Sequence, residues 1–141
     1  MSVEDRLAII ETIARYSHAF DGKDARAYTS LFTDDGVFEI YLRSASEPVQ
    51  RYAGGAAIFE WVDEAFRGRL AEVQTRHNQS ATVFDELAPS TARTRTMLLE
   101  TRQRPGERHP VPYMTAVYRD KWRKTEQGWR FARREVHLDR A

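Results

Sequence analysis

The sequence predicts an α+β fold: a cone formed by a strongly bent, mainly antiparallel sheet and wrapped by three N-terminal helices. Two observations predict it. Helical patterns dominate the first part of the chain, whereas from residue 72 it reads as long strands separated by turn sequences. Early helices followed by antiparallel strands are typical of α+β domains. The 141 residues fit one domain, and we expect residues 1–141 to form it.

Three helices are expected before residue 72. Ser2 and Asp5 resemble a capping box, and apolar spacing predicts a first helix from about residue 3 to 20. Its predicted inward stripe is Leu7, Ile10, Ile13, Ala14 and Ser17. Asp21 continues that stripe, so it is either a helix-end residue or a carboxylate aimed into a pocket. Asp24 suits the N-cap of a short second helix. The third helix, GAAIFEWVDEAFRGRL, carries the stripe Ile58, Trp61, Val62, Ala65 and Phe66.

The strands follow from alternation and turn chemistry. DDG at 34–36 predicts a turn, GVFEIYL a strand and RYAG a short strand. Four long strands are then predicted in EVQTRHNQSATVFDEL, ARTRTMLLETRQ, YMTAVYRDKWRKT and GWRFARREVHLD. Their breaks, APST, RPGERHPVP and EQG, are rich in turn residues.

Alternation assigns inward faces to two of these strands. Because Arg93 and Arg95 are costly to bury, their face should meet solvent. The opposite face then carries Thr94, Thr96, Leu98 and Glu100. In the next strand the inward set is Met114, Ala116, Tyr118, Asp120 and Trp122. In the last strand both faces carry arginine, so alternation alone does not decide. Glu100, a carboxylate among apolar residues, is either functional or paired with a nearby arginine.

Composition excludes several functions. The 22 basic and 21 acidic residues give a net charge of +1, which argues against nucleic-acid binding and against an anionic membrane surface. No cysteine is present, so thiolate metal sites are excluded, and histidine spacing shows no metal motif. The N-terminus lacks a long apolar run, which predicts neither a signal peptide nor a membrane span and favours a cytoplasmic protein.

The motifs ARYSHAFDGKD, LFTDDGVFEI, TRHNQ and YRDKWRKTEQGWRFARR, taken together, resemble the SnoaL-like branch of the nuclear transport factor 2-like superfamily. The chain is similar to scytalone dehydratase, bile-acid 7α-dehydratase and hexachlorocyclohexane dehydrochlorinase. The resemblance implies a catalytic Asp–His pair, matched here by Asp21 and His77. It also implies a pocket arginine, matched by Arg134, and an acidic pocket residue near Glu100.

The chemistry implied is a lyase reaction without metal or cofactor on a small hydrophobic, cyclic or polyketide-like substrate. A histidine suits proton abstraction from carbon, and a carboxylate on its other nitrogen fixes the tautomer. The ring nitrogen that does not contact the carboxylate is expected to face an apolar cavity. Tyr16, Tyr118, Glu100 or Arg134 should bind the departing oxygen or an oxyanion. The apolar wall is expected from Phe20, Phe38, Ile40, Trp61, Leu98 and Met114.

Other functions stay open within the same resemblance. The oxyanion tyrosine of ketosteroid isomerase matches Tyr16, but its general-base aspartate falls on Ile40, and Glu39 lies on the opposite face of the strand. An isomerase, a cyclase, or a non-catalytic ligand-binding or subunit-interaction module remain alternatives. A homo-oligomer, either a dimer or a trimer, is expected.

Overall fold

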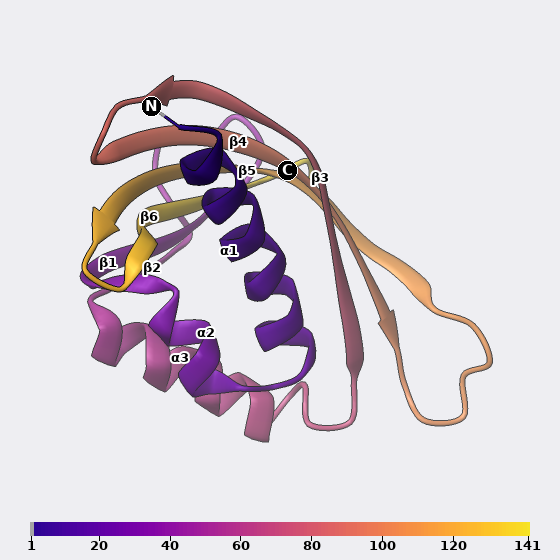
Figure 1. Cartoon of the computed structure of the whole chain (residues 1–141). Helices are drawn as coiled ribbons and strands as arrows, with labels where there is room; N and C mark the ends of the chain where they lie inside the picture. Colours follow the sequence, from indigo (N-terminus) through magenta and orange to yellow (C-terminus); the bar gives the residue numbers. More distant parts are fainter. Residues whose placement is uncertain (1) are drawn as a thin grey trace.

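The computed structural model describes residues 2–141 as three helices and one six-stranded sheet (Figure 1). In chain order the elements are α1 (Val3–Asp21), α2 (Ala25–Ser30), β1 (Phe32–Tyr41), β2 (Gln50–Ala53), α3 (Gly55–Arg67), β3 (Gln74–Leu87), β4 (Thr91–Gln103), β5 (Val111–Thr125) and β6 (Gly128–Leu138). The predicted α+β architecture is confirmed. No helix within residues 2–141 is both long and apolar enough to cross a membrane.

The sheet is strongly curved and open. Its strand order is β2-β1-β6-β5-β4-β3, and every neighbouring pair is antiparallel except β1 and β6, which run parallel. Figure 1 shows α1 lying in the hollow of the curved sheet, with α2 and α3 at one end. This arrangement gives the sheet a concave face that can enclose a pocket between strands and helices.

Helix α1 begins as predicted but presents a different face to the sheet. Ser2 is its N-cap and accepts a hydrogen bond from the Asp5 backbone N–H. Ile13 of the predicted stripe is buried, but Leu7 and Ile10 are exposed. The residues actually buried are Ile9, Thr12, Ile13, Tyr16, Ala19, Phe20 and Asp21. Thr12 can be buried because its hydroxyl donates to the Ala8 carbonyl oxygen at 2.8 Å, which satisfies its polar atom.

Strand β1 also differs from its prediction. The DDG segment at 34–36, predicted as a turn, lies within the strand. The pairing of β1 with β6 shifts register between Phe32 and Val37, so the segment forms a bulge instead of reversing the chain. Asp24 caps α2 as predicted, through a hydrogen bond from the Ala27 backbone N–H at 3.0 Å.

The inward faces of β4 and β5 are those that alternation predicts. Buried residues on these strands include Thr94, Thr96, Leu98, Glu100, Ala116, Tyr118, Asp120 and Trp122. In β6 the pairing register shifts, since Lys121 faces Arg133 whereas Trp122 faces Phe131. The buried positions of β6 therefore switch from odd-numbered residues, Trp129 and Phe131, to even-numbered ones, Arg134 and Val136.

Candidate active site

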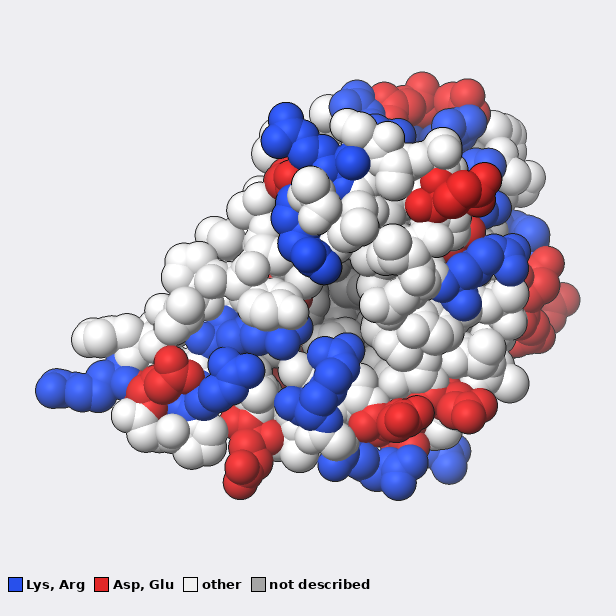
Figure 2. All heavy atoms as spheres, turned by 180° about the vertical axis from the view of Figure 1, so that it is seen from behind, with Lys and Arg blue, Asp and Glu red and all other residues white. Residues whose placement is uncertain are grey.

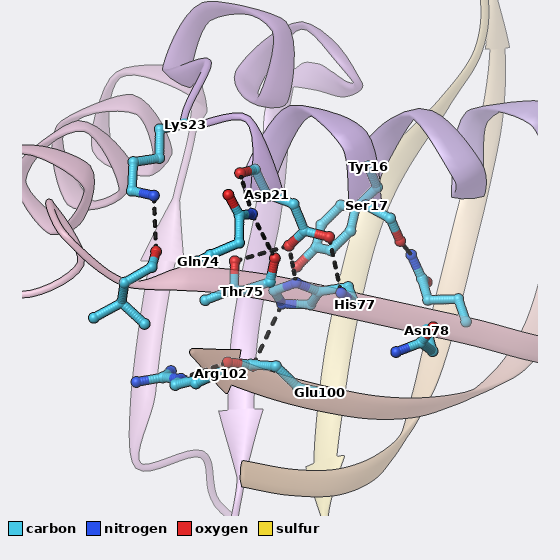
Figure 3. A network of polar contacts seen from close by, with 12 residues as sticks. Tyr16, Ser17, Asp21, Lys23, Gln74, Thr75, His77, Asn78, Glu100 and Arg102 are labelled. Atoms are coloured by element: carbon cyan, nitrogen blue, oxygen red, sulfur yellow. Dashed lines mark hydrogen bonds and ion pairs between the residues drawn. The ribbon is translucent and has the colours of Figure 1, made fainter. Parts of the chain in front are cut away.

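The carboxylate at the end of α1 and the imidazole near the start of β3 are in direct contact. Asp21 Oδ1 lies 2.7 Å from His77 Nδ1, and Asp21 Oδ2 accepts the backbone N–H of His77 at 2.8 Å. The hydroxyl of Thr75 donates to Asp21 Oδ1 at 2.8 Å. Figure 3 shows these three contacts converging on one carboxylate. Both residues are buried, at 7% and 8% exposure for Asp21 and His77.

The junction between α1 and β3 is held by further contacts around this pair. Lys23 Nζ donates to the Val73 carbonyl oxygen at 2.8 Å, and Gln74 Nε2 donates to the Asp21 carbonyl oxygen at 3.1 Å (Figure 3). Lys23 follows the C-cap Gly22 and has a φ of 55°, a left-handed conformation that costs about 1 kcal/mol for a residue other than glycine. Its side-chain contact with Val73, the residue before β3, helps to fix the helix end beside the strand.

The contacts of Asp21 keep it ionised. Burial, the largest single influence, raises its pKa, but the hydrogen bonds and charge of His77 and the hydroxyl of Thr75 outweigh burial and lower the pKa below its usual value. An ionised carboxylate can only accept hydrogen bonds. The Nδ1 atom of His77 must therefore carry a proton, which leaves Nε2 as the nitrogen that can exchange a proton with a neighbouring group or a bound molecule.

The sequence predicted that Nε2 of His77 faces an apolar cavity, but in the structure a carboxylate also lies beside this nitrogen. Nε2 lies 3.4 Å from Glu100 Oε1, and Arg102 Nε donates to Glu100 Oε2 at 2.7 Å. Figure 3 shows the imidazole between the two carboxylates. The inward direction of Glu100 was predicted, but the register that pairs it with His77 across β3 and β4 was not. Glu100 is thus both paired with an arginine and aimed at His77.

A cavity of about 620 Å³ opens in front of His77 and Glu100. Of the other residues predicted for the site, those that line it are Tyr16, Phe20, Phe38, Ile40, Trp61, Leu98, Met114 and Tyr118. These side chains give the cavity a largely apolar inner wall, on which the imidazole and the carboxylate are polar groups. Asp21 stands behind His77, outside this lining.

Tyr16 is placed to donate a hydrogen bond into the cavity. Its hydroxyl oxygen accepts from the Tyr28 hydroxyl at 3.1 Å, so its own proton is free for another acceptor. Burial raises the pKa of Tyr16, against the opposing charge of Arg134. The phenol therefore stays protonated over the physiological pH range.

Arg134 lies behind the cavity and not on its wall, contrary to the sequence prediction. Its side chain is fully buried, and its guanidinium carbon lies 3.4 Å from the centre of the Tyr118 ring and 4.1 Å from that of Tyr16. Nε stands 3.1 Å from Asp120 Oδ1, and an Nη donates to Gln79 Oε1. The parity change in β6 turns Arg134 inward, where it packs against the rings of Tyr16 and Tyr118.

Several residues of the cavity were not predicted. They are Val49, Gln50, Tyr52, Arg69, Arg102, Tyr113, Val136, Leu138 and Arg140. Arg102 was accessible to prediction, because it continues the inward parity of Leu98 and Glu100 by one further step. Arg69 and Arg140 lie outside regular elements, where no periodicity indicates direction. Within residues 2–141 no group of three or more His, Cys, Asp or Glu side chains is arranged to hold a metal ion.

Comparison with known proteins places this chain in a family. A nuclear transport factor 2-like protein with a cystatin-like fold from Novosphingobium aromaticivorans is 28% identical, with a TM-score of 0.80 over 96% of this chain and 82% of that one. A proposed aromatic ring hydroxylase from the same organism is 26% identical, with a TM-score of 0.79 over 98% and 91%. ActVI-ORFA from Streptomyces coelicolor shares the fold at 17% identity, with a TM-score of 0.82 over 96% of each chain.

No curated protein matches the sequence. The SnoaL-like domain, however, matches residues 1–135, which is nearly the whole chain. The chain therefore belongs to the SnoaL-like family of the nuclear transport factor 2-like superfamily.

Proposed function

We propose that the protein is a lyase that eliminates water or halide from a small, apolar, cyclic or polyketide-like substrate by acid–base catalysis. The observation that carries the proposal is the position of His77 between Asp21 and Glu100, at 2.7 Å and 3.4 Å, on the wall of an apolar cavity. Such a ring is oriented, is held in one tautomer and is open to a bound molecule on its basic side.

The first step in this proposal is removal of a proton from carbon. His77 Nε2 takes a proton next to a substrate carbonyl, and the C–H electrons form an enolate. The imidazolium produced lies between the two carboxylates of Asp21 and Glu100, which favour its positive charge. Tyr16 donates its free proton to the enolate oxygen as a hydrogen bond, in a cavity where water competes little.

The second step expels the leaving group. The enolate electrons form a carbon–carbon double bond, and the bond from the neighbouring carbon to oxygen breaks. The proton on Nε2 passes to the departing oxygen, either directly or after residence on Glu100, and leaves as part of water. Substrate loses one proton and one hydroxide, the enzyme returns to its starting state, and with a halide the proton goes to solvent.

The shape of the cavity supports a cyclic substrate. The Phe38 and Trp61 rings stack with centroids 5.0 Å apart, and Trp61 stacks on Tyr52 at 4.8 Å. These three rings line the cavity as one aromatic stack. Aromatic rings favour stacked or edge-to-face contact with another ring, so this stack suits a cyclic substrate better than a flexible chain.

The same geometry also supports an isomerase. Glu100 can hold the proton taken by Nε2 and return it to a different carbon of the enolate, in which case no group leaves. The difference between the two reactions lies in the substrate, because only a molecule with a leaving group next to the acidic carbon can undergo elimination.

The experiment is a turnover assay with 3-hydroxy-1-tetralone, which loses water to form the fluorescent 1-naphthol, and with halogenated cyclic ketones. Rates are measured between about pH 5 and 9 for the wild type and for His77→Gln. The proposal predicts conversion that falls by roughly 10²–10⁴-fold in His77→Gln. If the ketones bind equally well to both proteins and neither converts them, a non-catalytic binding module is the better description.

A further inference from the structure

The charges on the cavity wall are strongly unequal. The lining includes three arginines, Arg69, Arg102 and Arg140, but a single carboxylate, Glu100. The whole chain, in contrast, carries a net charge of only +1. Figure 2 shows a hollow on this face of the molecule with basic side chains around its opening.

The three arginines differ in their partners. Arg102 is bound to Glu100 at 2.7 Å, and its guanidinium carbon lies 3.4 Å from the centre of the Tyr113 ring, so its charge is neutralised and its position fixed. Within residues 2–141, Arg69 and Arg140 have no carboxylate within 4.0 Å. Both are exposed, which places them at the opening and not at the base of the cavity.

Two unpaired guanidinium groups at the opening of an apolar cavity favour an anion. A cleft with charges of one sign and low-dielectric walls concentrates the field at its mouth. The planar fork of arginine also matches the oxygen geometry of carboxylates and phosphates. The deeper walls, formed by residues such as Phe38, Leu98 and Leu138, suit an apolar body.

We infer that the molecule bound in this cavity joins an apolar ring body to an anionic carboxylate or phosphate group, and that Arg69 and Arg140 bind this group. As a statement about the substrate, this rests on the proposed function. As a statement about binding, it stands on the charge and shape of the cavity. The anion remains at the opening, while the ring places its reactive carbon near His77.

The test uses three probes of similar shape: 2-naphthoate, its neutral analogue 2-naphthamide, and 2-naphthyl phosphate. Binding to the full-length protein is measured by titration calorimetry at low and high salt. We expect at least one anion to bind about tenfold more tightly than the amide at low salt. The preference should shrink at high salt, because opening charges are screened. The tighter anion identifies the group for which the site is built.

The variants then assign the effect to residues. Arg69→Gln/Arg140→Gln should abolish the preference for the anion and leave amide binding unchanged. Arg93 is an exposed arginine on the outer face of β4, and Arg93→Gln serves as the matched control. This variant should keep the preference for the anion. Equal binding of amide and anions, or a preference that survives the double substitution, overturns the inference. His77→Gln should retain the preference, so a failure of catalysis is distinguishable from a failure of anion binding.

Discussion

Asp21 and His77 are joined twice, through the side-chain contact of 2.7 Å and through the backbone N–H of His77 at 2.8 Å. The same carboxylate thus orients the imidazole and connects the end of α1 to β3. One buried group therefore both orients the imidazole and holds the end of the helix, so a substitution at Asp21 should affect both.

Asp21→Asn is expected to lower activity and also to lower the free energy of unfolding, by about 1–3 kcal/mol. The amide replaces one acceptor oxygen with an NH2 group, which then faces a donor on His77 or Thr75. His77→Gln should cost less, because the backbone contact to Asp21 is retained. Chemical denaturation of the two variants measures the difference, and a smaller cost for Asp21→Asn than for His77→Gln would contradict the account.

Glu100→Gln separates proton removal from the departure of the leaving group. The substituted amide keeps the shape of the side chain but cannot carry the transferred proton, so dehydration of 3-hydroxy-1-tetralone should slow by roughly 10²-fold. Deuterium exchange next to the carbonyl of 1-tetralone, which requires only His77, should slow less. Equal losses in both assays would indicate that Glu100 merely positions the imidazole.

The buried pair of Asp120 and Arg134 gives the protein a distinctive pH dependence. Burial raises the pKa of Asp120 to about 7, although Arg134 opposes this shift. Between about pH 4 and 7 the folded state therefore holds a proton that the unfolded state has lost, so this group's stabilisation is complete at low pH and decreases as pH rises. Its contribution should fall by up to about 1.4 kcal/mol per pH unit in that window.

Asp120→Asn removes this titration, and denaturation curves of both proteins over that pH window measure the difference. The free energy of unfolding of the wild type should fall relative to that of the variant as pH rises. Parallel pH profiles for the two proteins would show that Asp120 is already ionised in the folded state at low pH.

The outer face of the sheet is the expected contact in a homo-oligomer. Its β4 residues Met97 and Leu99 are 57% and 42% exposed, apolar side chains on a face otherwise rich in basic residues. We expect a homodimer or homotrimer in solution by light scattering, and Met97→Glu/Leu99→Glu should make it monomeric. Leu7→Glu, an equally exposed apolar position on α1, is the matched control; a double variant with unchanged mass would locate the contact elsewhere.

Much of this site could be predicted where periodicity is regular. Alternation in β4 and β5 places Glu100 and Tyr118 on the inner face because their arginine neighbours resist burial, and the structure agrees. Alternation could not assign a direction to Arg134, because the register shift after Phe131 reverses parity in β6 and a bulge leaves no clear mark in a strand with arginine on both faces. The resemblance placed Arg134 in the pocket; it is turned inward, but it packs on the rings of Tyr16 and Tyr118 and does not line the cavity.

The face of α1 was predicted wrongly for a related reason. Leu7 and Ile10 look like core residues, yet they are exposed, while Thr12 is buried with its hydroxyl bound to the helix backbone. Helical spacing alone accommodates either stripe. The choice between them depends on Tyr16 and the aromatic residues it packs against, which come from α2, β5 and β6 and are distant in sequence.

The central claim is that His77 removes a proton from carbon in a molecule bound in the cavity. The most direct measurement follows hydrogen–deuterium exchange next to the carbonyl of 1-tetralone in deuterated buffer by proton NMR, since it needs no leaving group. The wild type should accelerate this exchange well above the buffer rate, and His77→Gln should return it to that rate. Exchange at the buffer rate in the wild type, or acceleration that is undiminished in His77→Gln, would contradict the claim.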